Sequence, residues 1–192
     1  LDGGISFEGV HDLENILLRC SKGGVATGED LLKVADTLRA ARKLRKIIFD
    51  QLIRPRLSEL LKDIATLPDL QKLLEFGLDE GGRIADRAST KLSELRRHRS
   101  AVRLQRKDIL QDIIRKYGGL LQDNIISERY GRPVLAFKAG TSDQIKGMVH
   151  DSSASGNTIY VEPQVVISIG NRLAKIDSEI SDEERRLLAS WS

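Results

Sequence analysis

The chain has 192 residues, of which 40% are hydrophobic and 31% charged, and its formal net charge is +3 at pH 7. This composition is typical of a soluble protein with enough apolar residues for a core. The sequence contains no run of about 18 uncharged apolar residues, the length needed to cross a membrane. The single cysteine excludes an internal disulfide. The cysteine and the three histidines have no spacing typical of a zinc site.

Residues 1–82 predict a helical core. Apolar residues recur at helical spacing in "HDLENILLRC", in the segment after Thr27, in "RLSELLKDIATL" and in "PDLQKLLEFGL". Thr27 and Asp30 match a variant of the capping box, which predicts the start of a helix that reaches about Gln51. Pro68 suits the first turn of a further helix. We interpret this region as a compact layer of helices.

Residues 83–120 predict one long helix. Gly81 and Gly82 break the preceding layer, and Asp86 is the expected cap of a helix that ends near Tyr117. Some 30 residues would make this helix about 45 Å long. Arg99 and Arg106 fall on its apolar stripe, so the surface that packs on another helix should be partly polar. The helix should therefore not form a regular coiled coil.

The periodicity changes after Gly118-Gly119. Short apolar runs between residues 121 and 163 predict three or four antiparallel strands, with hairpins at "RYGR" and "SASG" and a positive φ at Gly131. From Gln164 a helical pattern returns and predicts a second long helix over residues 164–192. The expected fold class is therefore mainly α with a small antiparallel β insertion: a helical core and two long helices that carry the strands at their tip.

The stretch from Ile145 to Pro163 contains the residue types of an active site, including His150, Asp151, three serines and Glu162. His150 and Asp151 are neighbours on a predicted strand, so their side chains should point to opposite faces. Small and polar residues in "SASG" are what a tight turn requires, although such a loop could alternatively bind an anion. Without a nucleophile elbow or a Walker loop, we interpret the stretch as a structural hairpin and expect no catalysis by this chain.

Two sets of residues in the strand region form recognisable motifs. In the first hairpin they are Arg129, Gly131, Arg132, Val134 and Lys138. In the second they are Gly147, Val149, His150, Asp151, Ser153, Ser155, Gly156, Thr158, Glu162 and Pro163. With these residues the strand region resembles the second branch of the bacterial MutS family, the branch not associated with mismatch repair. Upstream, "GRIADRAST" resembles the start of the family's lever helix. The resemblance covers essentially all 192 residues, with mild departures at Ser127, Ala136 and Tyr160.

This resemblance implies a division into a MutS-like core (1–82), an outgoing lever helix (83–120), a β clamp (121–163) and a truncated return lever helix (164–192). Both chain ends look cut, so we expect a fragment of a homodimeric parent protein. The resemblance places an ATPase domain, with ATP and Mg, and a C-terminal Smr endonuclease domain outside this chain, which itself should hold no cofactor. It implies branched-DNA binding with suppression of recombination, or rescue of collided ribosomes, in the cytoplasm or, for a plant or alga, in the plastid stroma.

Positive charge is concentrated in the predicted outgoing helix. From Arg83 to Lys116 the sequence has eleven Lys and Arg against four Asp and Glu. Such an excess is typical of a nucleic-acid surface, although a solvated helix face is the simpler alternative. With the resemblance, we predict nucleic-acid contacts by Arg96, Arg97, Arg99, Arg103, Arg106 and Lys107 on the helix, and by Arg129, Arg132, Lys138 and Lys146 on the strands.

Binding through these cations should depend on backbone and shape, and should weaken steeply with salt. Tyr130, in the first hairpin turn, could stack on a base. The alternative hypothesis is a structural module for dimerisation or protein interaction, without nucleic-acid contact. Neither hypothesis involves a membrane.

Overall fold

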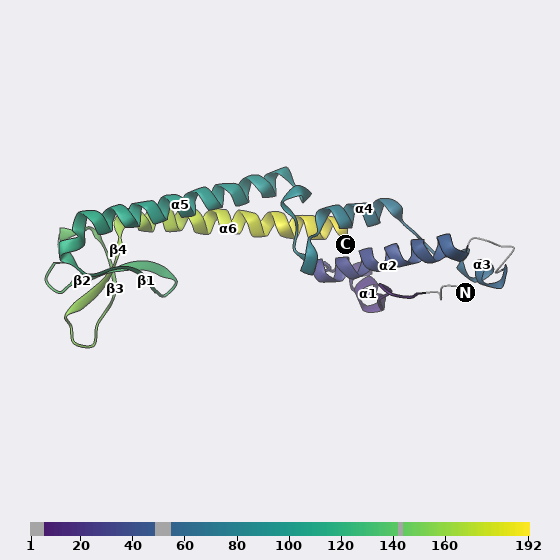
Figure 1. Ribbon diagram of the computed structural model, residues 1–192, viewed down its shortest axis with the longest axis horizontal. Coiled ribbons are helices and arrows are strands. Elements are labelled where there is room, and N and C mark those ends of the chain that lie inside the picture. The colour runs from purple at the N-terminus through teal and green to yellow at the C-terminus, as the bar shows by residue number, and fades with distance from the viewer. Residues whose placement is uncertain (1–5, 49–54, 142–143) are drawn as a thin grey trace. The chain divides into compact units, whose positions relative to one another are not determined.

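The computed structural model describes residues 6–48, 55–141 and 144–192. The described residues form six α-helices and one four-stranded antiparallel sheet, which confirms the predicted fold class (Figure 1). The chain divides into two compact units. The helical unit comprises the residues up to Ser93 together with Asp182–Ser192, and the sheet unit comprises Glu94–Ser181. Among the described residues, no helix has the length and apolar character needed to cross a bilayer.

Four helices belong entirely to the helical unit: α1 (Glu14–Ser21), α2 (Gly28–Ile48), α3 (Pro55–Leu61) and α4 (Pro68–Gly77). α2 buries residues at three-, four- and two-residue steps, namely Leu31, Ala35, Leu38, Ala40, Leu44 and Ile48. Leu74 of α4 is also fully buried, so the apolar stripes of these helices form the core, as predicted. The expected end of α2 at Gln51 lies outside the described residues.

The predicted capping box at the start of α2 is confirmed. The backbone N–H of Asp30 donates to Thr27 Oγ1 at 3.2 Å. In return, the backbone N–H of Thr27 donates to Asp30 Oδ2 at 3.2 Å. Both groups satisfy donors that the first helical turn would otherwise leave without partners.

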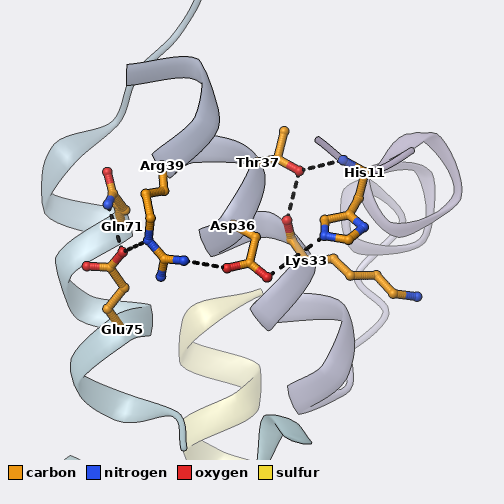
Figure 2. A network of polar contacts seen from close by, with 7 residues as sticks. All are labelled: His11, Lys33, Asp36, Thr37, Arg39, Gln71 and Glu75. Carbon is orange, nitrogen blue, oxygen red and sulfur yellow. Dashed lines mark hydrogen bonds and ion pairs between the residues drawn. The ribbon is translucent and has the colours of Figure 1, made fainter. Parts of the chain in front are cut away.

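A network of polar side chains links α2 to α4 and to the segment before α1 (Figure 2). Arg39 donates from Nε to Glu75 at 2.8 Å and from Nη1 to Asp36 at 2.7 Å, while Gln71 Nε2 donates to Glu75 at 2.8 Å. His11 Nε2 lies 3.8 Å from the Asp36 carboxylate. The hydrogen bonds from Gln71 and then Arg39 hold the pKa of Glu75 below its ordinary value despite partial burial. Arg39 therefore links α2 to α4 through Glu75, and Asp36 of its own helix pairs with the same guanidinium.

α5 (Thr90–Tyr117) begins later than the sequence predicted, and the predicted cap at Asp86 is wrong. Asp86 lies in a 3₁₀ turn that ends at Ala88, and Ser89 after it is extended with φ −152°. The cap is Ser89, because the backbone N–H of Leu92 donates to its Oγ at 3.3 Å. The extended backbone at Ser89 separates the turn from the helix, so a cap placed before it cannot serve α5.

The helical unit contains a buried carboxylate, Glu183, in the last turns of α6 (Gln164–Trp191). Its side chain is 1% exposed, and it accepts hydrogen bonds from Arg186 at 2.7 and 3.0 Å and from Ser89 Oγ at 2.8 Å. Lys91 Nζ lies 3.4 Å away. The bonds from Arg186, followed by that from Ser89, lower the pKa of Glu183 to about 2. This carboxylate is charged and fully paired at neutral pH.

The sheet unit contains β1 (Leu121–Arg129), β2 (Arg132–Lys138), β3 (Gly147–Ser152) and β4 (Thr158–Pro163) in the order β1-β2-β4-β3. All neighbours are antiparallel, and the number of strands agrees with the prediction. A small core joins the sheet to the two helices, combining Leu121, Leu135, Phe137 and Val161 with Leu110 of α5 and Val166 of α6. Within this unit the sheet therefore packs on the adjoining ends of α5 and α6 (Figure 1).

Both hairpin turns have the predicted chemistry. Tyr130 and Gly131 have φ of 51° and 73°, which is the geometry of a two-residue type I′ turn. In the second hairpin Gly156 has φ 70°, and the backbone N–H of Thr158 donates to Ser153 Oγ at 3.0 Å. The interpretation of "SASG" as a turn is confirmed, since its serine and glycine meet local backbone requirements.

Candidate nucleic-acid interface

The six predicted contact residues on α5 occupy two kinds of position. Arg97, Arg103 and Lys107 are exposed, whereas Arg96, Arg99 and Arg106 are half-buried. Arg99 Nη1 lies 3.2 Å from Asp177 Oδ1 of α6. This contact agrees with the predicted partly polar packing surface, because Arg99 stands on the same helix side as the buried Val102. Part of the basic run thus holds the two helices together, and part faces solvent.

Three of the predicted cations meet in a groove with a volume of about 260 Å³. We call it the arginine groove. Arg103 and Arg106 come from α5, Arg132 comes from the start of β2, and Gly170 and Asp177 of α6 also line the groove. Among the described residues neither Arg103 nor Arg106 has an ion-pair or hydrogen-bond partner. Two guanidinium groups in this groove are therefore available to an anion.

A buried carboxylate positions the third arginine of the groove. Glu162 is 1% exposed, and its Oε1 lies 3.5 Å from Arg132 Nη1. Glu162 Oε2 lies 2.9 Å from His150 Nε2, and Oε1 has no hydrogen-bond partner among the described groups. Arg132 therefore rests against a charge that is itself only half paired, and its remaining N–H donors can reach the groove.

The other strand cations do not join the arginine groove. The Arg129 guanidinium stacks on Tyr160, 3.9 Å from the ring centroid, and its Nε lies 3.4 Å from Asp151. Lys138 Nζ donates to the carbonyl oxygen of Gly119 at 3.0 Å. Lys146 is exposed beside a separate groove of about 710 Å³. The ten predicted residues thus form no single patch, and Arg103, Arg106 and Arg132 are the three that line a common groove.

Tyr130 is the most exposed large side chain of the hairpin turns, at 83%. Its positive φ places the side chain at the tip of the first hairpin, where a base or another ring could stack on it. Among residues 6–48, 55–141 and 144–192, no three His, Cys, Asp or Glu side chains come together in a way that could hold a metal ion.

Comparisons with known proteins give a consistent result. No protein-family model matches the chain. It is 42% identical over 186 residues to the endonuclease MutS2 of Synechocystis sp., an alignment that covers 97% of this chain and 23% of that protein. It is 36% identical over 187 residues to the endonuclease MutS2 of Pelotomaculum thermopropionicum, covering 96% and 24%, respectively. The chain belongs to the MutS2 branch of the MutS family. The resemblance inferred from the two hairpins is thereby confirmed.

This MutS2-family chain spans about a quarter of the length of the curated relatives that it matches, including a 35% identical protein from Symbiobacterium thermophilum. Endonuclease activity is part of the names of those longer proteins. What the matching quarter contributes must come from its own residues, and the arginine groove brings together cations that have no partner among the described residues with Arg132.

The sequence did not indicate the pairing of His150 with Glu162 or the role of Gly170 beside the groove. His150 and Glu162 pair across the β3–β4 hairpin, at a point where the strand register shifts between Val149 and Asp151. Asp151 takes a different partner, Arg129, so His150 and Asp151 are not paired with each other. Gly170 could have been noticed, because an isolated glycine within a helical pattern often marks a close approach.

Proposed function

We propose that this MutS2-family chain is the part of its protein that engages nucleic acid, through phosphates and shape rather than through base sequence. The observation that carries the proposal is the pair Arg103 and Arg106, which have no ion-pair or hydrogen-bond partner among the described residues, together with Arg132 at the arginine groove. Arginine is suited to this role because its planar donors match phosphate oxygens.

The distribution of charge supports the same function. In the sequence, residues 94–181 carry 14 Lys and Arg against 10 Asp and Glu, whereas the rest of the chain carries 17 against 18. The excess positive charge thus belongs to the sheet unit alone. A concentrated positive field raises the association rate with a polyanion and contributes binding free energy without reading bases.

The working partner we propose is branched DNA, with suppression of recombination, or the RNA of collided ribosomes. In this proposal residues 83–120 and 164–192 act as lever helices, residues 121–163 as the clamp, and residues 1–82 as the core. The energy for closure comes from an ATPase domain outside this chain that uses ATP and Mg, within a homodimer, and strand cleavage belongs to a separate Smr domain.

A second function is favoured by a specific surface of the sheet. The edge strands β1 and β3 expose Ile125, Met148 and Val149, each more than half exposed. Exposed apolar groups on unpaired sheet edges are typical of protein-interaction sites. In this alternative the clamp contacts protein, and the chain serves dimerisation or assembly without touching nucleic acid.

Fluorescence anisotropy with labelled probes separates the two functions. The probes are a four-way DNA junction, a duplex of the same length and a ribosomal RNA stem-loop, each titrated at 50 and 200 mM salt. Four phosphate contacts would lower the affinity roughly 100-fold over this salt range. We expect tighter binding to the junction or to the stem-loop than to the duplex. If no probe binds at 50 mM salt while the folded chain self-associates, the protein-interaction function replaces this proposal.

A further inference from the structure

We propose that the arginine groove is a preformed site for a single phosphate group, held by Arg103, Arg106 and Arg132. The assignment to a backbone phosphate rests on the proposed nucleic-acid function, whereas the site itself follows from the geometry of the groove. Four features of the described residues carry it.

The first feature is positive charge that no carboxylate of the described residues neutralises. Arg103 and Arg106 line the groove and have no ion-pair partner among the described residues. The one carboxylate on the wall, Asp177, already faces Arg99 at 3.2 Å. Because Glu162 offsets Arg132 and Arg99 offsets Asp177, the groove keeps a net positive charge of about two, which suits a phosphodiester or a phosphate dianion.

The second feature is the positioning of Arg132. Its guanidinium lies against the buried Glu162, which is held from the other side by His150 at 2.9 Å. Contact with a buried carboxylate limits the rotamers of Arg132 before any ligand arrives. Because the Nη1–Oε1 separation is 3.5 Å, this contact is an ion pair without a hydrogen bond. The guanidinium donors thus stay available for a ligand, at a lower entropic cost of binding.

The third feature is space. Gly170 lies in the second turn of α6, inside the helix, where glycine costs about 1 kcal/mol relative to alanine. A Cβ at this position would lie 3.1 Å from Arg132 Nη1 and 3.9 Å from Glu162 Oε1. The absence of a side chain at residue 170 therefore leaves room for the guanidinium and keeps the groove open beside it.

The fourth feature is size and lining. The volume of about 260 Å³ is several times the roughly 30 Å³ that one water occupies in the liquid, so a partly hydrated phosphate fits. Leu173, Ala174 and Pro133 complete the walls with apolar atoms. The rest of the lining is mostly polar, so charged and polar groups face a ligand in the groove.

The test uses the whole chain and inorganic phosphate as the probe. Phosphate replaces chloride at constant ionic strength while the backbone amide signals of Gly131 and residue 170 are followed by NMR. The variants are Gly170→Met, which fills the groove and leaves all charges in place, and Arg132→Gln. The matched control is Lys175→Gln, an exposed cation of α6 outside the groove lining. Each protein is also titrated with the labelled four-way junction and with the labelled ribosomal RNA stem-loop.

We expect saturable phosphate shifts at Gly131 in the native chain and in Lys175→Gln, and their loss in Gly170→Met. Junction affinity should fall roughly tenfold in Gly170→Met and in Arg132→Gln, as for one lost charged contact. Lys175→Gln should change it less than about twofold, which is the effect of one distant charge.

The outcomes separate the two proposals. If the junction binds the native chain and Gly170→Met equally and phosphate causes no saturable shift, the groove is not a phosphate site, and the nucleic-acid function stands without it. If phosphate saturates the groove but neither the junction nor the ribosomal RNA stem-loop binds, the groove holds a free phosphate compound and the nucleic-acid function is wrong. If phosphate, the junction and the stem-loop all fail to bind, both proposals are overturned.

Discussion

The two units of this chain each bury one glutamate, and the two glutamates are paired differently. In the helical unit Glu183 is 1% exposed and receives hydrogen bonds from Arg186 and Ser89, with Lys91 nearby. In the sheet unit Glu162 is equally buried, but only Oε2 has a hydrogen-bond partner. A completely paired carboxylate stabilises the fold, whereas a half-paired one leaves an adjacent arginine able to bind something else.

The arginines of the two units show the same contrast. Arg39 and Arg186 of the helical unit are each committed to carboxylates at 2.7 to 3.0 Å. Arg103 and Arg106 of the sheet unit have no such partner among the described residues. Arg39 and Arg186 therefore serve stability, whereas Arg103 and Arg106, in our proposal, serve binding.

The largest effect should come from removing the charge of Glu183. Glu183→Gln keeps the shape of the side chain but loses the charge-assisted bonds from Arg186 and Ser89, so we expect the free energy of unfolding to fall by about 3 kcal/mol. Denaturant titration measures this change. The control is Asp182→Asn, whose pair with Arg185 is largely exposed and should contribute less than about 1 kcal/mol. Equal losses in both variants would show that Glu183 has no special role.

The free energy of unfolding of the native chain should depend on pH through Glu183. The folded pKa of Glu183 is about 2, below the ordinary value of 4.5, so its contribution is present above pH 4.5 and is lost as the pH falls toward 2. We expect a loss of roughly 2 kcal/mol from this group, discounted because Arg186 and Lys91 are more than half exposed. The difference between the native chain and Glu183→Gln, followed by denaturant titration from pH 5 to 2, isolates it. A difference that does not change with pH would contradict the lowered pKa.

A smaller effect is expected from His150 in the sheet unit. His150→Ala leaves Glu162 Oε2 buried without a donor, which should destabilise the fold by about 1 to 2 kcal/mol. His98→Ala is the control, because His98 is exposed and makes one surface contact with Arg172. If His150→Ala is as stable as the native chain, the pairing of His150 with Glu162 does not support Arg132.

The smallest effect on stability should come from the groove arginines. Arg103→Gln with Arg106→Gln removes two cations that have no described protein partner, so the free energy of unfolding should change by less than about 0.5 kcal/mol. A loss above about 1 kcal/mol in denaturant titration would mean that these arginines hold the fold together, as those of the helical unit do.

Much of the fold could be predicted from the sequence, because its signals are local. The capping box at Thr27, the positive φ of Gly131 and the start of α6 at Gln164 each depend on a few neighbouring residues. The cap of α5 was misplaced, since the choice between Asp86 and Ser89 depends on an extended residue that no spacing rule reveals.

The arginine groove could be predicted only in part. The basic run identified Arg103 and Arg106, and the family resemblance identified Arg132, but nothing local brings the three together. Their meeting depends on how α5 packs along α6 and on the bulge at His150 that turns its ring toward Glu162. Packing register and bulges are tertiary properties, so the sequence indicated the cations without indicating the site.

The salt dependence of junction binding tests the central claim most directly. Each phosphate contact contributes about 0.9 to the slope of log affinity against log salt concentration. If Arg103 and Arg106 contact phosphates, the slope of the Arg103→Gln, Arg106→Gln chain should be shallower than that of the native chain by about 1.8. Parallel slopes for the two proteins would show that these arginines do not contact nucleic acid, and would contradict the account.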